Sequence, residues 1–157
     1  MHSPVPDAHA FTLVVRWLHV ASMAVALGGA VLLVALPAGR EPSEERHRAL
    51  VAVAARYEWA FWAAIGLLAM TGVGNLAAFG IDLPMATTRW GGVFAVKLVA
   101  VIALATFSVP RTLAIAQLRA KPEAVGARVV TMLRALYSVT SAGLAAVLAL
   151  AVWLAHG

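Results

Sequence analysis

The chain has 157 residues, of which 62% are hydrophobic and 12% are charged, and its mean hydropathy is +0.88. A water-soluble domain of this size needs far more polar surface, so the composition excludes one and indicates a protein covered by lipid. The net charge is +5. The basic residues flank apolar runs and form no polar face interleaved with aromatics, which argues against a nucleic-acid partner. The absence of cysteine excludes disulfides and thiol chemistry.

The first of four long apolar runs extends from about residue 11 to 36. Its part from Trp17 to Leu36 makes about 30 Å of helix, which matches the thickness of the hydrocarbon core. The segment before it has no basic residue and the run is too long for a signal peptide, so we expect it to remain as a span.

The second run covers about residues 57–79. Upstream of it, Ser43 followed by Glu44 and Glu45 is typical of a helix start in water, because serine caps the first turn and acids favour its positive end. Aromatic residues at the entry of this run suit the membrane–water interface, namely Tyr57, Trp59 and Trp62.

The third run covers about residues 90–110 and closes at Pro110, after which the sequence predicts a helical extension and a turn. The fourth covers about residues 132–155. Nothing remains for a soluble domain once these runs are subtracted, so residues 1–157 are expected to form a single all-α integral membrane four-helix bundle.

The distribution of Lys and Arg predicts the orientation of the chain. Nine of the twelve flank the runs on the side of the first and third loops: Arg40, Arg46, Arg48, Arg56, Arg111, Arg119, Lys121, Arg128 and Arg134. Positive charge gathers on the cytoplasmic side, so both termini should lie outside a bacterial plasma membrane.

Small residues recur four apart on the first and fourth runs, which allows close helix packing. We expect both of these stripes to face protein: Ser22, Ala26 and Ala30, and Ser138, Ala142 and Ala146.

Ionisable side chains inside spans are costly and often mark functional sites. Arg16, His19 and Met23 recur one turn apart, so they share one face near the outer end of the first helix. An imidazole and a thioether there could bind Cu(I). The alternative is that His19 hydrogen-bonds to a neighbouring helix while Met23 simply packs.

Three further charged residues fall within the runs, namely Glu58, Lys97 and Arg134. Lys97 lies in the outer half of the third run, at a depth comparable to that of His19, where it could snorkel outward or hold an anion. Glu58 lies near the cytoplasmic end of the second run, and we expect a structural ion pair with Arg134 or with Arg56.

Other metal donors are expected on the outer side, namely His2, His9, Met70, Met85 and His156. His156 could also join His19 as a second axial ligand of a haem b, although such a haem would lie at the periphery. No hydrolase or nucleotide-binding motif is present, so an enzyme is less expected than a binding protein.

The segments RWLHVASMAVALGG and TTRWGGVFAVKLVAVIALATFSVPR, with Thr71-Gly72 between them, resemble the copper-resistance D (CopD-like) family of membrane proteins. The resemblance follows the order of the family's motifs over most of the chain. It implies copper binding or copper passage at the outer face, with His19 and Met23 as candidate ligands.

Two other functions remain open. The arrangement of His19 and Lys97 also resembles that of HemJ-type protoporphyrinogen oxidases, which would imply a haem-linked enzyme. Alternatively, the chain could be an accessory subunit of a larger respiratory or photosynthetic membrane complex, or a homo-oligomer.

Overall fold

The computed structural model describes residues 6–36, 43–78, 88–121 and 126–156. They form four helices, α1 (Pro6–Ala35), α2 (Glu44–Ala78), α3 (Arg89–Ala120) and α4 (Ala127–His156). Each helix is long and apolar enough to cross a bilayer, over Ala10–Ala35, Glu44–Val73, Arg89–Ala120 and Ala127–Leu154. The predicted class, an all-α protein with four packed membrane-spanning helices, is confirmed.

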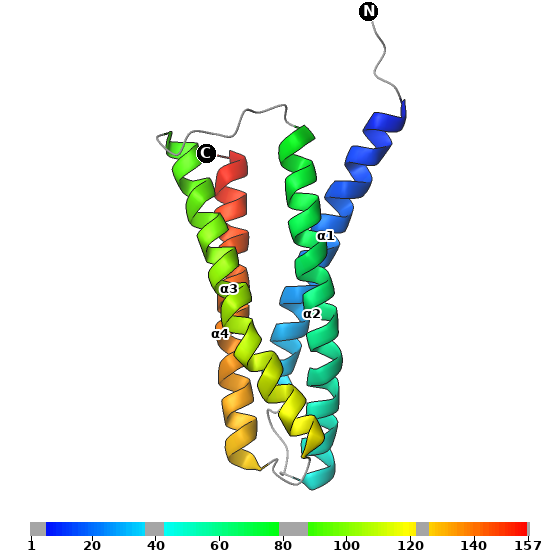
Figure 1. Cartoon of the computed structure of the whole chain (residues 1–157), viewed down its shortest axis with the longest axis vertical. Coiled ribbons are helices and arrows are strands. Elements are labelled where there is room, and N and C mark those ends of the chain that lie inside the picture. The colour runs from blue at the N-terminus through cyan, green and yellow to red at the C-terminus, as the bar shows by residue number, and fades with distance from the viewer. Residues whose placement is uncertain (1–5, 37–42, 79–87, 122–125, 157) are drawn as a thin grey trace, which may run out of the picture.

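The helices run alternately up and down, and each packs against its neighbours in the chain, while α4 also packs against α1 (Figure 1). The start of α1 and the end of α4 lie at the same end of the bundle (Figure 1). We call the half of the bundle at this end the terminal half, and the other half the distal half.

Local sequence signals account for two of the helix starts. The Ser43 hydroxyl accepts a hydrogen bond from the Arg46 amide at 3.3 Å, so α2 begins as predicted. Thr88 does the same for the Gly91 amide at 3.0 Å and caps α3.

The helical extension predicted beyond Pro110 is confirmed, because α3 continues without a break to Ala120. Proline is tolerated within membrane helices more readily than in soluble ones. Hydroxyl groups on both sides of Pro110 contact backbone carbonyls of the same helix: Ser108 donates to the Leu104 carbonyl at 2.8 Å, and Thr112 reaches the Ser108 carbonyl at 3.0 Å.

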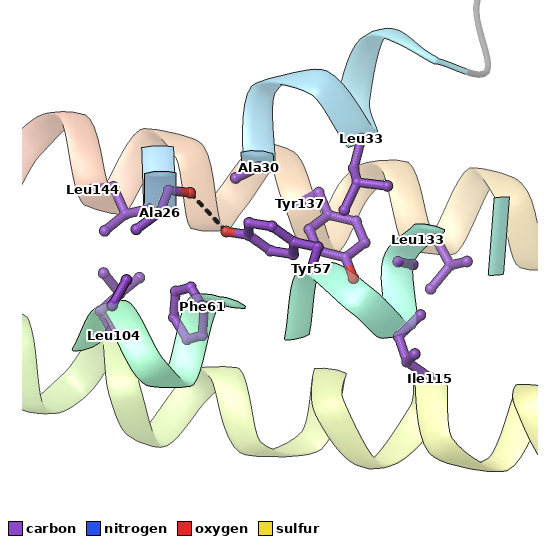
Figure 2. Packing of buried hydrophobic residues seen from close by; sticks show 12 residues of the cluster. Ala26, Ala30, Leu33, Tyr57, Phe61, Leu104, Ile115, Leu133, Tyr137 and Leu144 are labelled. Atoms are coloured by element: carbon purple, nitrogen blue, oxygen red, sulfur yellow. Dashed lines mark hydrogen bonds between the residues drawn. The ribbon is translucent and has the colours of Figure 1, made fainter. Parts of the chain in front are cut away.

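The core fills the distal half and the middle of the bundle, where all four helices contribute buried apolar side chains (Figure 2). The hydroxyl of Tyr57 on α2 donates to the Ala26 carbonyl of α1 at 2.7 Å (Figure 2). The Tyr57 ring lies directly against Gly29, where a Cβ atom would clash with it. A small residue on α1 therefore allows α1 and α2 to approach closely.

Only one of the two predicted small-residue stripes faces protein. Ser22, Ala26 and Ala30 on α1 are 5%, 0% and 0% exposed, as expected. The stripe on α4 was wrongly predicted, since Ser138, Ala142 and Ala146 are all exposed. Larger residues occupy the inward face of α4 instead, namely Leu133, Tyr137, Thr140 and Leu144.

The inward faces follow seven-residue steps, which divide the bundle interior into three layers. The distal layer consists of Leu33, Tyr57, Arg111 and Tyr137, all buried. The middle layer consists of Ala26, Ala64, Leu104 and Leu144, also buried. The terminal layer consists of His19, Thr71, Lys97 and Ala151, of which Thr71 alone is buried. The inward residues are therefore more deeply buried in the distal half than in the terminal half.

Candidate functional site

His19 on α1 is held by a hydrogen bond to Thr71 on α2. The distance from His19 Nδ1 to Thr71 Oγ1 is 2.8 Å. The Thr71 hydroxyl has a single proton and lies 2.6 Å from the Leu67 carbonyl, to which it donates. Nδ1 of the neutral imidazole must therefore carry the proton and donate to Thr71. This leaves the lone pair of Nε2 free to accept a proton or to bind a metal ion.

Gly72 borders the same imidazole ring. A Cβ atom placed on Gly72 would lie 3.8 Å from His19 Cε1, which is ordinary van der Waals contact. Thr71 thus fixes the histidine by a hydrogen bond, while Gly72 lies beside the ring with room for a methyl group.

Lys97 on α3 brings a positive charge to the same layer. Its side chain is half-buried and its ammonium group interacts electrostatically with His19. Among the described residues no carboxylate pairs with Lys97, since the ion pairs there are Arg48–Glu44 and Arg111–Glu58. The terminal layer therefore holds a cation without a counterion in the described part of the chain.

Apart from Met23, one turn from His19 on the same helix, the other predicted outer-side residues are not brought together in the described part of the chain. Arg16 is exposed on α1, whereas Met23 is half-buried and packs against the core one turn below His19. Met70 is 74% exposed and points away from the bundle. The predicted donors His2 and Met85, and the side chains of His9 and His156, lie outside the described part. Within that part no three His, Asp or Glu side chains group as metal ligands would.

A second polar cluster lies in the distal half, around Glu58 of α2. Arg111 of α3 contacts both carboxylate oxygens, with Nε 2.8 Å from Oε1 and Nη2 3.1 Å from Oε2. The Tyr137 hydroxyl of α4 donates to Oε1 at 2.8 Å, and the Thr112 hydroxyl reaches Oε2. Arg111 also donates to Thr140 Oγ1 at 2.6 Å. Glu58 and Arg111 are 4% and 1% exposed, so this cluster joins α2, α3 and α4 inside the bundle.

Aromatic rings surround the guanidinium of Arg111. Its Cζ atom lies 4.5 Å from the ring centre of Phe61, 5.0 Å from that of Tyr137 and 5.7 Å from that of Tyr57. Such contacts stabilise a cation that has lost its water. Tyr57 and Trp62, predicted at the membrane interface, thus belong to the bundle interior, and the Trp62 indole donates to Thr112 at 2.9 Å.

The partner of Glu58 was wrongly predicted. Arg134 and Arg56 are both exposed, and Arg111 forms the ion pair instead. Arg111 was expected in a flanking segment because Pro110 precedes it. A signal was nevertheless present, because Leu104, Ser108, Arg111 and Ile115 recur at helical spacing and share one face.

Comparisons with known proteins identify no relative. No protein-family model matches the sequence, and neither the curated proteins nor the solved structures contain a significant match.

The two polar clusters differ in what they can still bind. In the distal cluster both carboxylate oxygens of Glu58 are already bonded, and none of the buried side-chain nitrogen and oxygen atoms among the described residues lacks a partner. In the terminal layer Nε2 of His19 and the ammonium of Lys97 remain available. The terminal layer is therefore the candidate functional site, and the distal cluster is a structural tie.

Proposed function

We propose that this four-span membrane protein binds copper at the outer face of a bacterial plasma membrane, as a protein of the copper-resistance D type. The observation that carries the proposal is the state of His19. Its Nδ1 atom is engaged by Thr71, so Nε2 is free to act as a ligand. A metal-binding histidine commonly donates a hydrogen bond from its second ring nitrogen in this way, and this bond fixes the orientation of the imidazole ring.

Met23 would supply the second donor. It lies one helical turn below His19, and its thioether suits Cu(I), for which imidazole is also a good ligand. The two residues belong to the segment RWLHVASMAVALGG, and Thr71-Gly72 to the second element, on which the family resemblance rests. The hydrogen bond from His19 to Thr71 thus links two of the motifs that carry the resemblance.

The proposed orientation places both termini outside. Eight of the twelve Lys and Arg residues lie toward the distal end or its loops, once Arg111 is assigned to the interior. The terminal half, with His19, would then face the outer side. Copper would be taken up from that side as cargo.

Metal analysis and an absorption spectrum of the protein, purified in mild detergent from its native membrane, test this proposal. We expect near-stoichiometric copper, lost in His19→Ala and retained in the control His47→Ala, which changes a partly exposed histidine at the distal end. Thr71→Val should weaken copper binding by roughly 10–100-fold, because it removes the group that orients His19.

Two outcomes would favour the alternative functions. A Soret band that disappears in His19→Ala would indicate haem instead of copper. A colourless, metal-free protein that copurifies at a fixed ratio with other chains would indicate an accessory subunit. Copper content unchanged by His19→Ala would refute the assignment of His19 as a ligand.

A further inference from the structure

Lys97 has a position that copper binding does not explain. It shares the inward face of α3 with Leu104 and Arg111, at seven-residue intervals, so its stem begins on the side of the helix that faces the bundle. A half-buried ammonium in an apolar span is costly unless an anion accompanies it. Arg111, the equivalent cation two layers below, forms an ion pair with Glu58. Lys97 has no such partner among the described residues, and a cuprous ion would add positive charge beside it.

The inward faces of the helices in the terminal half are apolar and less buried than those of the middle layer. In the middle layer the inward side chains are 9% exposed or less, whereas the apolar residues on the inward faces of the terminal half are only partly buried: Val15, Phe94, Val101, Leu150 and Ala151. Ala151 occupies the position that Tyr137 and Leu144 fill in the layers below. Apolar walls with a few convergent polar groups are typical of sites for small, largely apolar molecules.

The polar groups available select the head group of such a molecule. The lone pair of His19 Nε2 can accept a hydrogen bond or a proton. The ammonium group of Lys97 can donate hydrogen bonds and therefore needs an acceptor. A carboxylic acid satisfies both, because it can give its proton to the Nε2 lone pair, and the carboxylate so formed accepts from Lys97 and from the protonated imidazole. The phosphodiester of a phospholipid is already ionised and brings no proton for Nε2. It would also lie nearer Arg89, about 12 Å along the helix from Lys97 at 1.5 Å per residue.

We propose that the terminal half of the bundle binds an amphipathic carboxylic acid, with its head group between His19 and Lys97 and its apolar body among α1, α3 and α4. The occupant is a fatty acid or a molecule of that class, which enters from the surrounding bilayer. The inference stands on Lys97, which is not a copper ligand. Because the acid and copper would both use His19 Nε2, the two would bind alternatively and not together.

Binding of the fluorescent fatty acid cis-parinaric acid, measured on protein in phosphatidylcholine nanodiscs, tests the proposal. We expect saturable binding at one site per chain, and the uncharged methyl ester should bind at least tenfold more weakly. Lys97→Met should weaken binding of the acid by roughly tenfold or more, the usual effect of losing one hydrogen bond to a charged group. Lys97→Arg should retain the binding. Lys121→Met, at the exposed end of α3, is the matched control and should change nothing.

Three outcomes would overturn the proposal: equal affinity for the acid and its ester, no effect of Lys97→Met in a correctly folded variant, or Lys97-dependent retention of phosphatidylglycerol in place of the acid. Thermal melting of each variant separates misfolding from lost binding, and Lys97→Arg tests the charge in a stable chain. Copper content is measured on the same variants. Copper lost in His19→Ala but kept in Lys97→Met would support copper binding even if the fatty acid fails to bind.

Discussion

Removal of the Arg111 side chain is expected to cost more stability than any other single truncation of an arginine in the described helices. Arg111→Met leaves the Glu58 carboxylate, 4% exposed, without its cation and with two of its four hydrogen bonds gone. Breaking a buried ion pair by removing one partner costs about 3–5 kcal/mol. In a bilayer the polar groups of the separated helices find other partners, which reduces the loss. We therefore expect Arg111→Met to lower the free energy of unfolding by about 3 kcal/mol. This corresponds to roughly a 100-fold change in the unfolding equilibrium.

Reversible unfolding by sodium dodecyl sulfate in mixed micelles, followed by tryptophan fluorescence, measures this loss. Arg134→Met is the control, because Arg134 is exposed, and it should change the free energy of unfolding by less than about 0.5 kcal/mol. The double variant Glu58→Leu/Arg111→Met removes both charges and should lose much less than the sum of the single variants. If Arg111→Met is no more harmful than Arg134→Met, the ion pair does not tie the helices together.

Two further predictions concern packing and sidedness. Gly29→Ala should lower the free energy of unfolding by about 1–3 kcal/mol, because the added methyl meets the Tyr57 ring, whereas Gly28→Ala, with open space at its Cβ, should cause no loss. A Gly29→Ala variant as stable as Gly28→Ala would contradict the close approach of α1 and α2. Since the chain lacks cysteine, Ser3→Cys and Ser43→Cys can be labelled singly on intact cells with an impermeant maleimide. Only Ser3→Cys should react, and the reverse pattern would invert the proposed topology.

The fold was predictable because the bilayer dictates the hydropathy and the length of each span, whichever helices become neighbours. Four runs near 20 residues or longer can only be helices in lipid, since every backbone polar group must be satisfied within the segment. The start of α2 was equally local, because Ser43 caps it with its own hydroxyl. Signals of this kind need no knowledge of which helices are neighbours.

The contacts between helices were less predictable, because they depend on how each helix is rotated. The α4 stripe of Ser138, Ala142 and Ala146 looked as suitable for packing as the α1 stripe, but Tyr137 faces inward instead. The reason lies on other helices, since the Tyr137 hydroxyl binds Glu58. In lipid, both faces of α4 are apolar enough to be covered, so hydrophobicity alone could not decide between them.

The order of the layers along the bundle bears on whether the proposed copper ion would be held in the terminal half or conducted across the membrane. Between the terminal layer, with His19 and Lys97, and the distal cluster around Glu58 lies the apolar middle layer, whose side chains are 9% exposed or less. An ion that moved from one polar layer to the other would have to cross that layer without a ligand, and would then meet a guanidinium already enclosed by Phe61 and its neighbours. The packed distal half therefore favours binding of the proposed ligand in the terminal half over its conduction through the bundle.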